Sequence, residues 1–228
     1  MAIGGIADES LTGTVPPYFT GSHAQRMPDF TPRDIDALCA APHVLHAQGA
    51  HTNARRLVAH RQHDMLVLSL GDYRGELRRA VHLMKFRNAR WITARFGRNL
   101  GRVARERFDG GRPDLVTWAP TTKRRARRRG HDQSSIIASN AARAMNVRRL
   151  RCLRRTDDRA QTGATRQERR RGPCYVVREL AVRGKRILLV DDVMTTGTTL
   201  ERARDALLSA GAAEVRCAVV AHVRRVRE

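Results

Sequence analysis

Two adjacent carboxylates followed by a loop of hydroxyl side chains form the stretch of this sequence best suited to chemistry. The stretch is RILLVDDVMTTGTTL at 186–200, and Asp191 and Asp192 follow its apolar run. Threonine hydroxyls, backbone N–H groups and a helix N-terminus suit a phosphate monoester, and a glycine lets the backbone approach it closely. Paired carboxylates would repel that phosphate, so they suit the hydroxyl pair of a ribose or a magnesium ion. A sugar phosphate satisfies both halves of the stretch.

Two other phosphate-binding patterns are missing from the sequence. No Gly-Lys-Ser/Thr follows the loop, which excludes a Walker site, and there is no Gly-x-Gly-x-x-Gly of the dinucleotide-binding type. The alternative interpretation is an ordinary strand-to-helix turn in which a threonine caps the helix. Two adjacent carboxylates and five loop residues rich in hydroxyls favour the sugar-phosphate interpretation.

The elements around this stretch alternate between strands and helices. The run 187–190 is short, apolar and uninterrupted, as is typical of a strand buried on both faces, and we expect Asp191 and Asp192 to end it. Further strands are expected at 65–70, 114–118, near Tyr175 and at 215–220, and helices from Arg74, at about 89–107, at 133–145 and at 198–209. This alternation predicts an α/β fold with a mainly parallel sheet and helices on both faces. Such sheets bind ligands at the carboxyl ends of their strands.

The N-terminal quarter of the chain differs from the rest. Residues 1–62 are rich in proline and histidine and show little periodicity, so we expect a partly disordered extension there. Thr31-Pro32-Arg33-Asp34 predicts a short helix that runs to about Cys39. The organised domain is expected to cover residues 63–228.

The charge balance points to a polyanionic partner. The chain has 44 basic and 22 acidic residues, and 22 basic and 6 acidic residues lie between Arg112 and Arg186. Biased codon usage is the alternative, because only Lys85, Lys123 and Lys185 are lysines, yet it hardly explains KRRARRR at 123–129. If that partner is single-stranded DNA, the aromatic content of 4% is low, since single-strand platforms stack bases on aromatic rings.

No segment indicates a membrane protein or a secreted one. No apolar run reaches the ~20 residues that a membrane span needs, and the N-terminus has no signal-peptide pattern. The four cysteines show no close pairing. We therefore expect a cytoplasmic protein in a reducing compartment, without membrane insertion.

The segment ILLVDDVMTTGTT at 187–199 resembles the phosphoribosyl pyrophosphate (PRPP) signature of type I phosphoribosyltransferases. The wider sequence resembles the ComF branch, which is linked to natural competence. DYRGELRRAVHLMKFRNAR at 72–90 is similar to its Tyr-x-Gly…Lys-Phe helix. Residues 115–133 are similar to its strand, proline-containing loop, basic helix and Arg-Gly-Phe-Asn-Gln motif, and 154–177 to its Arg…Gln…Arg loop. The resemblance covers roughly residues 65–222 and implies a type I phosphoribosyltransferase (Rossmann-like) fold.

The resemblance implies PRPP binding with Mg²⁺, and transfer of the phosphoribosyl group to an unidentified acceptor if the protein is an enzyme. Asp191 and Asp192 would hold the ribose hydroxyls, and Arg159, with Gln161 and Arg166, would lie in a mobile loop that closes over the reacting centre. The other implied binding residues form the 5′-phosphate loop and the pyrophosphate loop: Val193, Met194, Thr195, Thr196, Gly197, Thr198 and Thr199, and Pro120, Thr121, Thr122 and Lys123. The alternative is a non-catalytic competence protein whose arginine-rich region binds single-stranded DNA or proteins of the competence machinery.

The sequence departs from the family pattern in three places. His131 and Asp132 replace the phenylalanine and asparagine of the Arg-Gly-Phe-Asn-Gln motif, and Ala119-Pro120-Thr121-Thr122 replaces Pro-Val-Pro-Leu. These changes affect the expected acceptor site more than the PRPP site. Family members commonly begin with a Cys-x-x-Cys zinc module, which this chain lacks. A metal site built from histidines is one interpretation of His43, His46, His51, His60 and His63, but solvent-exposed histidines are favoured, so no metal ligands are predicted.

Overall fold

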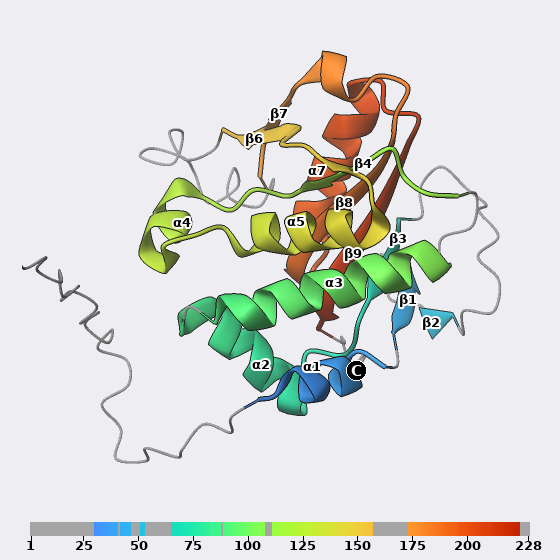
Figure 1. Cartoon of the computed structure of the whole chain (residues 1–228). Coiled ribbons are helices and arrows are strands. Elements are labelled where there is room, and N and C mark those ends of the chain that lie inside the picture. The colour runs from blue at the N-terminus through green and yellow to red at the C-terminus, as the bar shows by residue number, and fades with distance from the viewer. Residues whose placement is uncertain are drawn as a thin grey trace, which may run out of the picture.

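The computed structural model is built around a seven-stranded sheet with the order β2-β1-β3-β9-β8-β4-β5 (Figure 1). The strands of this sheet are β1 His43–His46, β2 His51–Thr52, β3 Leu66–Ser69, β4 Leu115–Trp118, β5 Arg148–Arg149, β8 Arg186–Met194 and β9 Glu214–His222. The structure describes residues 30–40, 42–46, 51–52, 65–87, 89–107, 111–156 and 173–223.

Most neighbouring strands of the sheet are parallel. The pairs β3–β9, β9–β8, β8–β4 and β4–β5 are parallel, whereas β1 joins β3 and β2 joins β1 in the antiparallel sense. The expected strand near Tyr175 is β7 (Tyr175–Val177), which pairs with β6 (Leu153–Arg155) in a separate two-stranded sheet. The expectation of a mainly parallel α/β sheet is confirmed.

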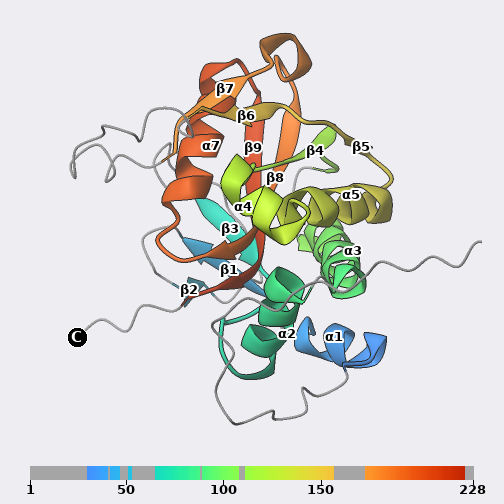
Figure 2. The ribbon, with the colours of Figure 1, turned by 90° about the vertical axis from the view of Figure 1, so that its left-hand side faces the viewer.

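Helices cover both faces of the sheet. Helices α2 (Gly75–Phe86), α3 (Arg90–Arg107) and α5 (Gln133–Met145) lie on one side and α7 (Thr198–Ser209) on the other (Figure 2). Strand β8 divides its side chains between them, since Leu188 and Val190 pack with α3 and α5 while Ile187 and Leu189 pack with α7. All four are fully buried, which confirms the prediction from the apolar run. Within the described ranges, the other helical elements are α1 (Pro32–Leu38), α4 (Lys123–Arg129) and the 3-10 helix η2 (Glu179–Ala181).

Helices α3 and α5 approach each other very closely because glycines line the contact. A Cβ atom on Gly97 would lie 2.6 Å from the Ile137 carbonyl oxygen, and one on Gly101 would lie 2.5 Å from that of Ala141. Backbone atoms of a buried helix cannot move aside as a flexible side chain can, so only glycine fits here. This contact fixes α5, whose N-terminus reaches the candidate site.

Two segments that precede residue 62 contact the rest of the fold. The predicted capping of α1 is confirmed: Thr31 N donates to Asp34 Oδ2 at 2.7 Å, and Asp34 N donates to Thr31 Oγ1 at 3.3 Å. Asp36 of α1 accepts from Arg95 Nε at 2.7 Å, and the hydrogen bond from Arg95 lowers the pKa of Asp36 to about 2. Strand β1 pairs with β3. The domain boundary at residue 62 stays a prediction.

Strand β8 is longer than expected. The prediction that Asp191 and Asp192 end the strand is wrong, because β8 continues to Met194, with Asp191 paired to Val219 and Val193 to Ala221. Carboxylates disfavour strands, but the parallel neighbour β9 supplies backbone partners for these residues and overrides that tendency. The two carboxylates are therefore carried by a paired strand rather than by a loop.

Candidate functional site

The site lies where neighbouring strands send their connections to opposite faces of the sheet. Strand β4 leads through α5 to β5, whereas its neighbour β8 leads through α7 to β9 on the other side. The carboxyl ends of two such strands frame the crevice in which open α/β sheets bind ligands. A cavity of about 350 Å³ lies there, lined by residues at the end of β8, by residues that follow β4 and β8, and by residues of α2, α4, α5 and β6.

The threonine loop forms a second, smaller hollow beside that cavity. This hollow of about 30 Å³ is lined by Asp191, Val193, Met194, Thr195, Thr196, Gly197, Thr199 and Leu200. Gly197 has φ 84°, a left-handed conformation that glycine adopts without steric cost, and it precedes α7 with no side-chain cap. The first N–H groups of α7 and the threonine hydroxyls can therefore serve a bound anion.

The two carboxylates have different partners. Asp191 Oδ1 accepts hydrogen bonds from Ser134 Oγ and from Asp192 N, both at 2.8 Å. Asp192 Oδ1 accepts from Val193 N at 2.6 Å, and its Oδ2 lies 2.9 Å from Lys85 Nζ. Asp191 is thus held from α5, and Asp192 is held from α2.

The environment of Asp191 favours its protonated form. Burial, followed by the neighbouring negative charge of Asp192, raises the pKa of Asp191 from 3.8 to about 7, although Ser134 and Lys85 act in the opposite direction. The residue as a whole is only half-buried because it also lines both hollows. The pair therefore carries less than two full negative charges near neutral pH.

The loop after β4 contributes only part of its expected residues. Pro120 and Thr121 line the larger cavity. Thr122 instead caps α4, where its Oγ1 accepts from Arg125 N at 3.2 Å, and Lys123 begins that helix; neither lines the cavity.

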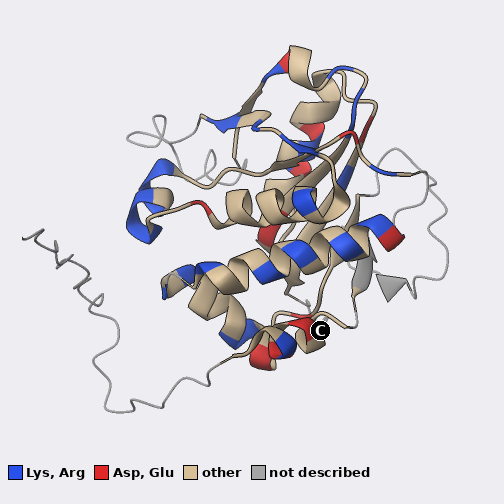
Figure 3. Cartoon of the chain, viewed as in Figure 1, with Lys and Arg blue, Asp and Glu red and all other residues tan. Residues whose placement is uncertain are grey.

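Three arginines that were not named as site residues from the sequence line the cavity, and two of them belong to the basic block at 123–129. Arg125 and Arg129 reach it from α4 and Arg155 from β6. The spacing of four residues between Arg125 and Arg129 places both on one side of a helix, and this was the available signal. Together they give the cavity a cationic wall, and α4 is basic along nearly its whole length (Figure 3).

Helix α2 contributes two more residues that sequence reasoning missed, Tyr73 from the turn before it and Lys85 from its last turn. Lys85 belongs to the stretch that resembles the family's Lys-Phe motif and is one of three lysines in the chain, so both signals were present in the sequence. Its position opposite Asp192 depends on the tertiary structure.

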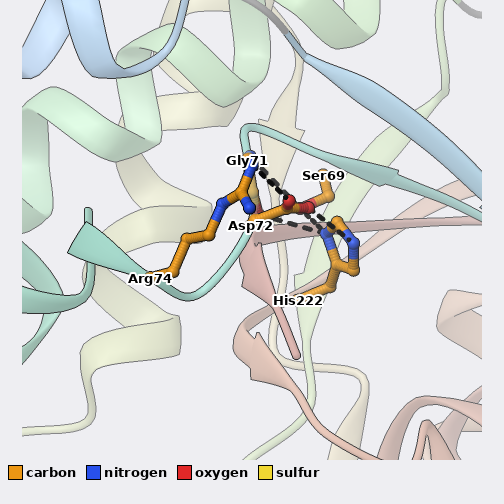
Figure 4. A network of polar contacts seen from close by, with 5 residues as sticks. All are labelled: Ser69, Gly71, Asp72, Arg74 and His222. Carbon is orange, nitrogen blue, oxygen red and sulfur yellow. Dashed lines mark hydrogen bonds and ion pairs between the residues drawn. The ribbon is translucent and has the colours of Figure 1, made fainter. Parts of the chain in front are cut away.

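A buried polar network fixes the turn before α2 (Figure 4). Asp72 Oδ1 lies 3.0 Å from His222 Nε2, and His222 Nδ1 lies 3.1 Å from both Ser69 Oγ and the Gly71 carbonyl oxygen. The backbone adds a bond of 2.7 Å from Tyr73 N to the His222 carbonyl oxygen. The end of β9 therefore holds the segment from which Tyr73 enters the cavity.

The residues that depart from the family motif lie at the start of α5. Asp132 lines the cavity and accepts from Trp118 Nε1 at 3.1 Å, and burial raises the pKa of its carboxyl group. Burial, with help from the charge of Arg90, lowers the pKa of His131, so its ring is favoured in the uncharged form. The cavity therefore has an acidic side chain where the family pattern has an amide.

Some predicted residues cannot be placed. Arg159, Gln161 and Arg166 lie outside the described residues, as do His60 and His63. Among the residues that the structure describes, no group of three or more His, Cys, Asp or Glu side chains could hold a metal ion. In the same part of the chain, no helix is both long and apolar enough to cross a membrane.

Comparison with known proteins finds a matching domain family and similar proteins. The phosphoribosyl transferase domain family matches residues 132–228. The DNA utilization protein YhgH of Salmonella typhi is 31% identical over 156 residues, which cover 65% of this chain and 68% of that protein. YhgH of Escherichia coli K12 is 31% identical over 160 residues, with the same coverage.

Among solved structures, glutamine PRPP amidotransferase from B. subtilis is 25% identical with a TM-score of 0.41, covering 56% of this chain and 26% of that one. Purine phosphoribosyltransferase from Pyrococcus horikoshii is 19% identical with a TM-score of 0.38, covering 60% of this chain and 79% of that one. The chain thus spans about a quarter of the amidotransferase. The chain is 31% identical to YhgH over about two thirds of that protein, and it matches the phosphoribosyl transferase domain family. Together with its motifs, these similarities show that the chain belongs to the ComF-like branch of the type I phosphoribosyltransferase family.

Proposed function

We propose that the cavity binds PRPP. The 5′-phosphate would lie in the threonine-lined hollow at the start of α7, and the ribose hydroxyls would bind at Asp191 and Asp192. The diphosphate would extend toward Pro120, Thr121 and the arginines of the larger cavity. The observation that supports this proposal most is that the two hollows adjoin: four residues line both of them, namely Asp191, Val193, Thr195 and Thr199.

The charge distribution supports this orientation. The hollow for a single phosphate is built from N–H and hydroxyl groups, whereas the larger cavity has four cationic side chains: Lys85, Arg125, Arg129 and Arg155. A diphosphate carries more negative charge than a monoester and gains more from these cations.

The same cations suit the transfer reaction. The bond between C1 of the ribose and the diphosphate oxygen breaks, and the diphosphate leaves with the electron pair. A lone pair of the acceptor forms the new bond at C1, and the acceptor loses a proton. Arginines around the departing group stabilise the charge that develops on it. Mg²⁺ bound with PRPP would supply further charge neutralisation, and Asp192 would contact it or the hydroxyls.

Calorimetric titration with PRPP and Mg²⁺ tests the binding. We expect heat of binding for the wild type, and its loss in the double variant Asp191→Asn, Asp192→Asn. The control variant Asp205→Asn, at an exposed carboxylate of α7, should bind as the wild type does. PRPP affinity that survives the double substitution would show that the acidic pair is wrongly assigned. Pyrophosphate release with candidate acceptors then tests turnover.

Arg159 remains part of the proposal as a residue of a closing loop. If residues 159–171 close over bound PRPP, the ligand should protect this arginine-rich segment from trypsin. Unchanged cleavage in saturating PRPP would count against the closing loop but not against binding at the acidic pair.

Single-stranded nucleic acid is the second candidate ligand, and we propose α4 as its contact. Arg124, Arg127 and Arg128 of this helix are exposed and do not line the cavity. Next to the helix, Phe86 is 49% exposed, and an exposed aromatic ring beside arginines suits the stacking of a base. The relatives in the comparison are named for DNA utilization.

The salt dependence of DNA binding tests this second candidate. Replacing Arg124, Arg127 and Arg128 with alanine should reduce the slope of log affinity against log salt by about 2, since each phosphate contact with a single strand contributes about 0.7. A triple replacement of the exposed α3 arginines, Arg98, Arg102 and Arg105, removes the same charge elsewhere. Equal losses in both variants would show that net charge alone, and not α4, drives binding.

A further inference from the structure

Lys85 approaches the acidic pair from a helix that the PRPP signature does not include. It lies in the last turn of α2, and the neighbouring Met84 and Val81 are buried in the core. The Lys85 and Asp192 side chains are 16% and 15% exposed, and both line the larger cavity. The ammonium group is therefore held by a packed helix at the wall of the proposed site.

The contact with Asp192 leaves Lys85 able to bind a second group. A lysine ammonium carries three N–H donors, and the pair with Asp192 Oδ2 at 2.9 Å uses one of them. Within the described part of the chain, the two others are available to a ligand in the cavity that Lys85 lines.

The chemistry of PRPP creates a need for a cation at this position. The diphosphate is attached to C1 of the ribose, next to the hydroxyls that Asp191 and Asp192 would bind. A negatively charged diphosphate and a carboxylate would then lie close together and repel each other unless a positive charge stands between them. Lys85 contacts the carboxylate on one side and faces the cavity on the other.

We propose that Lys85 binds the diphosphate group of PRPP and bridges it to Asp192. This inference rests on the proposed function and adds a recognition residue to it. A simple counter-ion for Asp192 would affect all ligands that contact the acidic pair equally. A bridging cation acts selectively on ligands that carry the diphosphate.

The test compares three ligands, PRPP, ribose 5-phosphate and pyrophosphate, by calorimetry. Lys85→Met keeps the apolar stem of the side chain and removes its charge. We expect this variant to bind PRPP and pyrophosphate about 10- to 100-fold more weakly, the range for loss of a charge-assisted hydrogen bond, and to bind ribose 5-phosphate within about twofold of the wild type. Lys85→Arg should recover most of the PRPP affinity, and the exposed control Lys185→Met should behave as the wild type. Thermal unfolding of each variant checks that it is folded.

Each outcome decides between the proposals. Unchanged PRPP binding in Lys85→Met, or an equal loss for PRPP and ribose 5-phosphate, overturns the bridging role while PRPP binding by the wild type stands. If the wild type binds pyrophosphate through Lys85 but gives no heat with PRPP, Lys85 is an anion-binding residue and the proposed function fails. If the wild type binds none of the three ligands, both proposals fail.

Discussion

Replacing Asp191 with asparagine should stabilise the protein at neutral pH. The amide oxygen can still accept the hydrogen bonds that Ser134 Oγ and Asp192 N donate to Asp191, both at 2.8 Å. What the substitution removes is a carboxyl group that burial and the charge of Asp192 make costly to ionise. The same change removes a proposed contact with ribose, so stability and PRPP affinity should move in opposite directions.

The expected magnitude and its sign follow from the pKa of Asp191, about 7 in the folded chain against an ordinary value of 3.8. Below pH 3.8 the carboxyl group is protonated in both the folded and the unfolded chain, and its contribution to stability is fully present. Between 3.8 and about 7 the unfolded chain has lost the proton while the folded chain keeps it, so stability falls by about 1.4 kcal/mol per pH unit. Over this range the total loss of stability is at most about 4 kcal/mol. Because the carboxyl group also faces the cavity, we expect a loss of about 2 kcal/mol.

Urea unfolding of the wild type and Asp191→Asn, followed by circular dichroism between about pH 4 and pH 8, measures this effect. The variant should match the wild type at the acidic end and exceed it by about 2 kcal/mol at the basic end, or by roughly 4–8 °C in Tm. Asp205→Asn, at an exposed carboxylate, is the control and should follow the wild-type curve. A stability difference between Asp191→Asn and the wild type that does not change with pH would refute the reasoning.

Three further substitutions test the packing that positions the site. Gly101→Ala should lower the free energy of unfolding by about 2 kcal/mol despite the better helix propensity of alanine, because the new methyl group meets a backbone oxygen at 2.5 Å. The control Arg98→Ala, at an exposed position of the same helix, should change the free energy of unfolding by no more than about 0.5 kcal/mol. A neutral Gly101→Ala in urea unfolding would mean that α3 and α5 can separate freely. Gly197→Ala should cost about 1–2 kcal/mol of left-handed strain and weaken ribose 5-phosphate binding by calorimetry; unaltered affinity would speak against the threonine hollow as the phosphate site. His222→Gln should lower the free energy of unfolding by about 2 kcal/mol because the buried network around it loses a partner, and no change in thermal unfolding would show that the network is dispensable.

The elements that depend on local pattern could be predicted from the sequence. Helices α5 and α7 begin and end at the predicted residues, 133–145 and 198–209, because apolar spacing and the flanking polar residues define them locally. The end of β8 could not be predicted in this way. Its last residues are in strand conformation because they pair with β9. Strand β9 follows α7 in the sequence, so a pattern within β8 alone does not reveal this pairing.

The residues of the candidate site also differ in how far the sequence predicts them. The acidic pair and the threonine loop are contiguous, so one motif predicts that they meet. Lys85, Arg125 and Arg155 come from three other elements, and their approach to the cavity depends on how α2, α4 and β6 are placed around the sheet. A pattern within one segment contains no information about that placement.

The site stands at the junction of two separately packed layers. Ser134, which holds Asp191, belongs to α5 on one face of the sheet, whereas the threonine loop leads into α7 on the other face. A sugar phosphate that contacted both Asp191 and the threonine loop would link the two layers. Amide hydrogen exchange should therefore slow in α5 and α7 together when it binds. Inorganic phosphate would reach only the start of α7 and should leave exchange in α5 as it is.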